Sequence, residues 1–351
     1  MAARAPRSVA PAPTPTGPAP TVLVMGAGSI GCWLGGRLQA AGATVHLVGR
    51  PRMLQALAEH GLTLTDLEGG RLQLPAAELQ LHAGVPAGLR PDLVLLCVKS
   101  GATAAAAAEL AQALPAGTLV LSMQNGISNV DVAQAAAPGL VLLRGMVPYN
   151  VAELGPGRLH RGTIGQLAGQ AHPGLAPCLP WLGAAGLPLA LHDDMLPLQW
   201  GKLLLNLNNA VNALSCLPLR QQLLDADLRQ CTAGLIGETL FLLQQAGIRP
   251  AQVSALRPGL LPMVLRLPTP LFRLLARRML RIDDKARSSM ADDLARNRPT
   301  EIDAIQGEVL RLATRLGQLA PCNARISQLV RAWSPRSQQL SGRSLRKFLN
   351  L

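Results

Sequence analysis

Three glycines near the start of the chain have the spacing of a phosphate-binding turn. Residues 26–31 read Gly-Ala-Gly-Ser-Ile-Gly and directly follow the apolar run Thr-Val-Leu-Val-Met at 21–25. In such a turn the glycines permit the chain reversal, the close approach of a pyrophosphate and the packing of the next helix, whose N-terminal amides bind the phosphates. The alternative is a glycine-rich turn that binds nothing. We predict dinucleotide contacts from Gly26, Ala27, Gly28, Ser29, Ile30 and Gly31.

A lysine and an asparagine later in the chain could transfer and orient a proton. Reduction of a ketone by hydride creates an alkoxide, so such a site needs a proton donor at the carbonyl oxygen. Lys202 and Asn206 share one face of a predicted helix that is otherwise lined by leucines. A lysine buried in such a wall is costly, which favours a functional role. The sequence leaves equally open that Lys202 lies exposed in the first turn of its helix.

The residues after the second predicted strand bear on the choice of dinucleotide. The strand at 44–48 is followed by Arg50 and Arg52, and no acidic residue stands there. An acidic residue at this point usually binds the ribose hydroxyls of NAD, whereas an arginine can pair with the 2′-phosphate of NADP. The sequence therefore favours NADPH, with Arg50 as its main cation. Arginines after a strand are also common surface residues, and that alternative stays open.

The strands that precede these residues indicate a parallel sheet. Apolar runs predict strands at 21–25, 44–48, 92–98 and 119–123. Strands that alternate with helices form parallel sheets, and ligands of such sheets bind at the carboxyl ends of the strands. Lys99 and Asn125 each come just after one of these strands and therefore join the predicted ligand site.

After about residue 190 the strand signals fade and helical segments follow, such as Leu235 to Gly247 and Glu301 to Leu316. We predict an α/β fold class, in which an N-terminal Rossmann-like parallel-sheet domain is followed by an all-α C-terminal domain. A chain of 351 residues suits two domains with the working site in a cleft between them. The predicted parts are a disordered Ala/Pro-rich tail at 1–20, an NADP-binding domain at 21–190, a helical domain at 191–335 and a basic tail at 336–351.

Composition narrows the class of protein. Aromatic residues make up only 2% of the chain, and leucine and alanine dominate, which favours helices over an all-β fold. No apolar stretch reaches the roughly 20 residues of a membrane span, and the N-terminus lacks a secretion signal, so we expect a cytoplasmic protein without a membrane partner. The six cysteines lack metal-ligand spacing, so no metal is predicted. The net charge of +13 is spread along the chain, which favours small anions over nucleic acid.

Taken in order along the chain, these motifs resemble those of the ketopantoate reductase family. The resemblance runs from about Thr21 to Ala332. Its motifs are Gly26-x-Gly28-x-x-Gly31, Val98-Lys99, Gln124-Asn125-Gly126, Lys202-x-x-x-Asn206, Ser288-Ser-Met290 and Pro299-Thr-Glu301-Ile-Asp303. The last two, with their separation, are the most specific. The resemblance implies NADPH-dependent reduction of 2-dehydropantoate to pantoate, on the route to pantothenate and coenzyme A.

The same resemblance implies that Lys202 is the general acid and that Glu301 supports substrate binding and proton transfer. Without it, Glu301 would be interpreted as ordinary helix chemistry. Thr300 and Asp303 resemble a capping box, and the helix dipole favours an acid in the first turn.

The remaining roles also come from the resemblance. It implies that Ser289 binds the substrate carboxylate, and that Asn125 and Asn206 orient the substrate and the lysine. It further implies that Lys99 and Arg50 contact the phosphate or ribose of the cofactor, which Asn125 also borders.

One position departs from the family pattern. The family usually has a second asparagine four residues after the first, but here that position is Ala210, within a run that also holds Asn208, Asn209 and Asn212. We consider Asn209 and Asn212 candidates for the missing substrate contact. The identity of the 2-oxo acid is therefore in doubt, and the arginine-rich segment 257–287 adds to that doubt because it could reshape the rim of the site.

The leading hypothesis is thus an NADPH-dependent reductase of a small 2-oxo acid, and the sequence is compatible with a homodimer. A paralogous reductase of another branched 2-oxo acid is one alternative. A second is a non-catalytic dinucleotide-binding regulator, which would keep the glycine turn and Arg50 but would have no use for Lys202 close to Glu301. Nucleic-acid binding by the basic C-terminal half is the third, although no recognition motif supports it.

Overall fold

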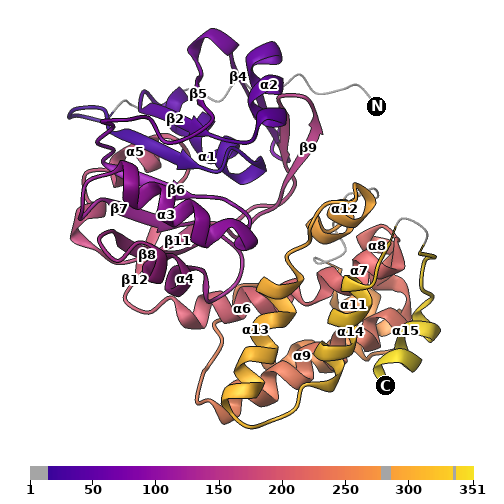
Figure 1. Cartoon of the computed structure of the whole chain (residues 1–351). Helices are drawn as coiled ribbons and strands as arrows, with labels where there is room; N and C mark the ends of the chain where they lie inside the picture. The colour runs from indigo at the N-terminus through magenta and orange to yellow at the C-terminus, as the bar shows by residue number, and fades with distance from the viewer. Residues whose placement is uncertain (1–14, 278–285, 335–336) are drawn as a thin grey trace. The chain divides into compact units, whose positions relative to one another are not determined.

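The strands predicted in the first half of the chain pair as one sheet. The computed structural model describes residues 15–277, 286–334 and 337–351. Its N-terminal unit, which is coloured indigo to magenta in Figure 1, ends at Met195. In this unit eight strands lie in the order β12-β11-β8-β7-β6-β1-β2-β5, and all neighbours are parallel except β8 and β11. The strands are β1 (Thr21–Met25), β2 (Thr44–Val48), β5 (Gln80–His82), β6 (Leu93–Leu96), β7 (Leu119–Ser122), β8 (Val141–Met146), β11 (Leu167–Gln170) and β12 (Leu189–His192).

Helices cover both faces of this sheet, which is why its central strands β1, β6 and β7 are apolar and buried along almost their whole length. Val22 and Val24 of β1 belong to the core beneath one set of helices, whereas Leu23 and Met25 belong to the core on the other face. The first set is α1 (Ser29–Ala40), α2 (Pro51–His60) and α5 (Leu179–Ala184), and the second is α3 (Thr103–Ala113) and α4 (Asn129–Ala136). The predicted Rossmann-like architecture is confirmed.

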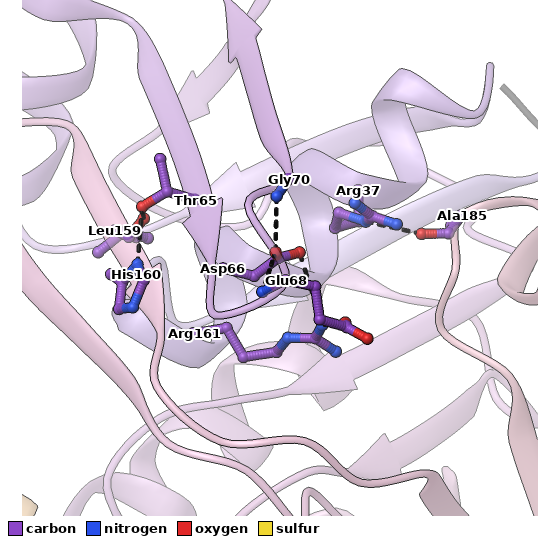
Figure 2. A network of polar contacts seen from close by, with 9 residues as sticks. All are labelled: Arg37, Thr65, Asp66, Glu68, Gly70, Leu159, His160, Arg161 and Ala185. Atoms are coloured by element: carbon purple, nitrogen blue, oxygen red, sulfur yellow. Dashed lines mark hydrogen bonds and ion pairs between the residues drawn. The ribbon is translucent and has the colours of Figure 1, made fainter. Parts of the chain in front are cut away.

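A smaller sheet, which the sequence analysis did not predict, holds the helix that follows the glycine turn. It has the order β4-β3-β10-β9. Arg161 of this sheet pairs with Asp66 and Glu68 at 3.5 and 2.6 Å (Figure 2). The same guanidinium lies 5.6 Å from the ring centre of Trp33, which belongs to α1. The sheet therefore braces α1 from its side. Its strands are β3 (Leu62–Asp66), β4 (Arg71–Leu74), β9 (Val151–Gly155) and β10 (Arg158–Arg161).

The C-terminal unit, residues 196–351, is helical as predicted, and α9 (Ala226–Gln245) is its longest helix. Against α9 pack α8, α10, α14 and α15. None of the described helices combines the length and apolar character of a membrane span. The other helices are α6 (Leu196–Asn206), α7 (Asn208–Ser215), α8 (Leu219–Leu224), α10 (Leu261–Leu265), α11 (Thr269–Leu275), α12 (Ser289–Ala295), α13 (Ile302–Arg315), α14 (Pro321–Arg331) and α15 (Gly342–Leu349).

The arginine-rich segment 257–287 is described up to residue 277 and again from 286. A buried arginine of α9 fixes its first part. Arg229 donates to the carbonyls of Leu265 and Leu267 at 3.1 and 3.0 Å, and its guanidinium lies 4.4 Å from the ring centre of Phe272. This part of the segment is therefore anchored in the helical core.

The predicted basic tail at 336–351 is wrong over most of its length, because residues 342–349 form the helix α15. Leu345 and Leu349 lie one turn apart and are buried against α9, while Arg346 pairs with Asp227 at 2.8 Å. Ser341 caps the helix. The boundary predicted at 190 falls inside β12, which still pairs with β11. Of the N-terminal tail, residues 1–14 lie outside the described part of the chain.

A histidine pair in the N-terminal unit predicts a dependence of stability on pH. Nδ1 of His46 lies 3.0 Å from Nε2 of His82 on the neighbouring strand. Burial, and then the charge of His82, lower the pKa of His46 below its ordinary value of 6.5. The unfolded chain then binds protons more readily, so stability is lost as pH falls through about 6.5. We expect acidification to lower the melting temperature, by less than about 4 °C from this pair.

The test is a series of thermal unfolding curves between about pH 7.5 and pH 5.5, across the titration range of histidine. His82→Gln should flatten the dependence on pH, because it prevents a second positive charge beside His46. His60→Gln, which replaces an exposed histidine outside this pair, is the control for the loss of one imidazole. Equal slopes in wild type and His82→Gln would contradict the prediction.

Candidate active site

The glycine turn joins β1 to α1 in the predicted strand, turn, helix context. Gly26 has a φ of +114°, and a Cβ there would lie 2.6 Å from the backbone nitrogen of Val98. A Cβ at Gly31 would lie 2.1 Å from the carbonyl oxygen of Gly26. At Gly28, by contrast, a Cβ would meet nothing within 4 Å. The fold therefore requires glycine at positions 26 and 31, while the space beside Gly28 is open, as the approach of a pyrophosphate demands.

The N-terminus of α1 offers free amides at this open space. Gly28 is the N-cap residue, and no side chain caps the helix. The amides of Ser29, Ile30 and Gly31 have no acceptor among the residues that the structure describes. Unsatisfied amides at a helix N-terminus bind anionic groups. The residues of this turn therefore fit the pyrophosphate of a dinucleotide.

The structure separates the two arginines that follow β2. Arg52 forms hydrogen bonds of 2.7 and 3.1 Å with the carboxylate of Glu153, which raise its pKa. Arg50 is exposed, and its guanidinium makes no hydrogen bond or ion pair with any described residue. The preceding Gly49 lies against the glycine turn, since its Cβ would approach that of Ala27 to 2.7 Å. The guanidinium of Arg50 is thus available to a ligand beside the turn, whereas that of Arg52 is bonded to Glu153.

A buried polar network fixes the loops after β6 and β7, which carry Lys99 and Asn125. Nε2 of Gln124 donates to the carbonyl just before Lys99 at 2.9 Å and to the hydroxyl of Thr103 at 2.7 Å. The hydroxyl of Ser100 donates to the carbonyl of Asn125 at 3.2 Å. The two loops are therefore held together near the end of β1. Sequence reasoning missed Gln124 and Thr103 as positioning groups, and only the place of Gln124 next to Asn125 hinted at the role.

In the helical unit Lys202 lies in the middle of α6, between buried Gly201 and Leu203, so it is not in the first turn. Burial lowers the pKa of Lys202 to about 8, and the carboxylate of Glu301 opposes this shift. Glu301 is the N-cap residue of α13, but its side chain makes no capping hydrogen bond. The capping-box interpretation of this region is therefore wrong. A lysine with such a pKa can exchange its proton near neutral pH.

The helix that carries Lys202 is interrupted just beyond Asn206. Leu207 belongs to neither α6 nor α7, and its carbonyl accepts a hydrogen bond of 3.1 Å from Nε2 of Gln306. Gln306 is fully buried and lies on α13, which begins next to Glu301. It ties the helix of the lysine to the helix of the carboxylate. Nothing in the sequence pattern indicated this role.

The asparagines between positions 206 and 212 differ in their burial and in their hydrogen-bond partners, which the sequence alone could not show. The side chains of Asn206 and Asn209 are partly exposed and form no hydrogen bond to any described residue. Ala210 and Asn212 are fully buried, and the structure places the amide of Asn212 in the core instead of an open substrate site. Ser289 is the exposed first residue of α12, and its hydroxyl has no partner among the described residues.

Two glycine variants should separate the demands of the fold from those of the ligand. Gly31→Ala places a methyl group against the backbone. We expect it to lower the free energy of unfolding by about 1–3 kcal/mol and also to weaken dinucleotide binding. Gly28→Ala meets open space, so it should keep the melting temperature but weaken binding. Thermal unfolding and titration of NADPH fluorescence measure the two effects. If Gly28→Ala binds NADPH like wild type, the predicted pyrophosphate position is wrong.

Comparison with known proteins places these features in one family. The family model described as Ketopantoate reductase PanE/ApbA matches residues 22–174, and the model of its C-terminal domain matches residues 194–334. A 2-dehydropantoate 2-reductase of Pyrococcus horikoshii is 27% identical over 322 residues, covering 89% of this chain and 96% of the relative. One of Halobacterium salinarum is 28% identical over 321 residues, covering 88% and 97%.

Solved structures agree with this result. A PanE/ApbA family ketopantoate reductase from Ralstonia eutropha superposes with a TM-score of 0.75 at 29% identity, covering 89% of this chain and 97% of that one. A D-mandelate dehydrogenase with NADH and anilino(oxo)acetate shares the fold, with a TM-score of 0.71 at 20% identity over 94% and 99% of the two chains. Both domain models match in order, so this chain belongs to the ketopantoate reductase family of oxidoreductases, whose members act on 2-oxo acids.

Proposed function

We propose that this protein is an NADPH-dependent reductase of a 2-oxo acid and that Lys202 is its proton donor. The observation that carries the proposal is the burial of Lys202 near Glu301. An ordinary lysine has a pKa of 10.5, whereas burial lowers that of Lys202 to about 8. General acids work best when their pKa lies near the working pH. A partly buried ammonium with a carboxylate nearby therefore suits proton transfer better than it suits packing.

In this proposal the helical unit supplies the acid and binds the substrate. NADPH, when bound, supplies the hydride that reduces the carbonyl carbon. Nζ of Lys202 gives its proton to the carbonyl oxygen as the alcohol forms, and takes another from water afterwards. Glu301 stabilises the charged form of the lysine, which keeps the acid protonated at neutral pH. Asn206 and Asn209, whose amides have no partner among the described residues, are available to hydrogen-bond the substrate.

The N-terminal unit would bind NADPH through the contacts predicted from the sequence. Amides at the start of α1 bind the pyrophosphate, and Arg50 pairs with the 2′-phosphate. The guanidinium of Arg50 is available to pair with a 2′-phosphate, whereas that of Arg52 is already bonded to Glu153. This supports NADPH over NADH as the cofactor. Lys99 and Asn125, held by the network around Gln124, contact the rest of the cofactor.

The substrate that we propose is 2-dehydropantoate. Relatives that match almost the whole chain are named 2-dehydropantoate 2-reductase. The product would then serve pantothenate and coenzyme A synthesis in the cytoplasm. Another branched 2-oxo acid is the second candidate. It is favoured by the fully buried Ala210, at the position where the family usually has an asparagine.

Oxidation of NADPH, followed by its absorbance, tests the proposal with a matched pair of ketones. We expect turnover with 2-dehydropantoate and at least tenfold lower kcat/KM with 3,3-dimethyl-2-oxobutanoate, which lacks only the terminal hydroxyl. Equal values for the two ketones would favour the second candidate. NADPH binding without turnover of any 2-oxo acid would instead indicate a dinucleotide-binding regulator and overturn the proposal.

A further inference from the structure

Asn212 is a buried polar residue of the helical unit, and both the nitrogen and the oxygen of its side-chain amide form hydrogen bonds. Nδ2 donates to the carbonyl of Leu217 at 2.9 Å and lies 3.5 Å from Oε1 of Gln222. Oδ1 accepts the backbone N–H of Ser288 at 2.9 Å. The side chain is fully buried, so it is not exposed for a ligand to contact.

The contact with Ser288 joins two distant segments at the start of α12. Ser288 is the N-cap residue of this helix, and its hydroxyl accepts the amide of Ala291 at 3.2 Å while donating to the carbonyl of Asn209 at 3.2 Å. Both the backbone and the side chain of Ser288 are therefore bonded to α7. The next residue is Ser289, which is exposed and whose hydroxyl has no partner among the described residues.

The choice of asparagine at this buried position has a physical reason. Ser288 is itself buried, and no helix or sheet partner accepts its amide among the described residues. A buried N–H group without an acceptor costs about 1–3 kcal/mol. A leucine at position 212 would fill the space but leave this donor unsatisfied, and α12 would lose its link to α7.

We propose that Asn212 is a positioning residue that holds Ser289 in place for a substrate carboxylate and does not touch the substrate itself. This inference rests on the proposed function, because it assigns Asn212 a role through Ser289. It also gives Asn209 and Asn212 different roles. The side-chain amide of Asn209 has no partner among the described residues, and the backbone carbonyl of Asn209 accepts from the hydroxyl of Ser288. The side chain of Asn212, by contrast, is bonded to the backbone of the same serine.

A double-mutant cycle of Asn212→Ala and Ser289→Ala tests this role. Each single variant should raise the KM for the oxo acid about tenfold, as expected for the loss of one charge-assisted hydrogen bond, with kcat and the KM for NADPH unchanged. The double variant should be no worse than either single one, because both remove the same contact. Effects that multiply would overturn the inference.

Asn323→Leu is the matched control. Asn323 is an equally buried asparagine of the helical unit, and its Nδ2 donates to Glu238 at 2.7 Å. Its replacement should lower the melting temperature without changing the KM for the oxo acid. A tenfold rise in this KM would mean that general destabilisation explains the Asn212 variants, and the inference would fail.

Asn212→Asp keeps the test decisive if the alanine variant does not fold. It retains an oxygen that accepts from Ser288, but its second oxygen faces the carbonyl of Leu217 and brings a charge into a buried site. It should therefore lower stability while leaving the KM of the folded protein within about twofold of wild type. Amide hydrogen exchange should show Ser288 and Ala291 protected in this variant, because their amides have acceptors at this contact. If those residues stay protected while KM rises as in Ser289→Ala, Asn212 contacts the substrate directly and the inference is wrong.

Hydrogen exchange also separates this inference from the proposed function. In wild type the amide of Ser288 should exchange slowly, and in Asn212→Ala faster, whether or not the protein reduces a 2-oxo acid. Absence of turnover in wild type would refute the proposed function. An unchanged exchange rate at Ser288 in a folded Asn212→Ala variant would refute the link between α7 and α12.

Discussion

Replacing Lys202 by methionine should lower turnover of the 2-oxo acid about a hundred-fold or more, because it removes the proton donor and keeps the length of the side chain. The melting temperature should stay the same or rise, since a partly buried ammonium costs solvation energy that a thioether does not. Steady-state kinetics and thermal unfolding measure the two effects on the same samples. A fall in melting temperature with unchanged turnover would assign Lys202 to packing.

The pH profile provides an independent test of the same residue. The pKa of about 8 means that the acid form of Lys202 is lost as pH rises through that value, so kcat/KM should fall on the alkaline side. Glu301 raises this pKa, so Glu301→Gln should move the alkaline limb to lower pH. In Lys202→Met the limb should vanish from the residual activity. A limb that persists there belongs to another group.

Replacing Arg50 by glutamine should raise the KM for NADPH about tenfold or more and leave the KM for NADH unchanged. The guanidinium can form charge-assisted hydrogen bonds to the 2′-phosphate, each worth about 1.5–3 kcal/mol, and NADH has no such phosphate. The ratio of the two KM values, measured with one 2-oxo acid, isolates this effect from any change in the chemical step.

Arg52→Gln is the control for this prediction, because Arg52 already pairs with Glu153 at 2.7 Å. It should change the KM for NADPH less than about threefold, as expected for the loss of an exposed ion pair. If Arg52→Gln has the larger effect, the 2′-phosphate lies on the other side of the turn. Equal changes for NADPH and NADH in Arg50→Gln would mean that Arg50 contacts a part common to both.

The spacing of glycines and of apolar residues was enough to predict the architecture of the N-terminal unit. The turn at 26–31 was predicted from its glycines, and the alternation of apolar strands with helices predicted the parallel sheet around it. The small sheet of β3, β4, β9 and β10 was missed, because its short strands are only partly buried and carry a mixed pattern. The helix α15 was missed because its arginines suggested a tail, although Leu345 and Leu349 share one face.

The sequence by itself determined the glycine turn between β1 and α1, the order of the two units and the placement of Lys202 and Asn206 on one helical face. These features depend on residues within a few turns or one strand of each other, so local periodicity specifies them. Which polar groups are free depends on partners from distant segments. Glu153 binds Arg52 and leaves the guanidinium of Arg50 available. Ser288 binds the side chain of Asn212 but only the backbone carbonyl of Asn209, which leaves the side chain of Asn209 available. Only the tertiary structure could decide this, because hydrogen bonds and burial between such segments have no local signature in the chain.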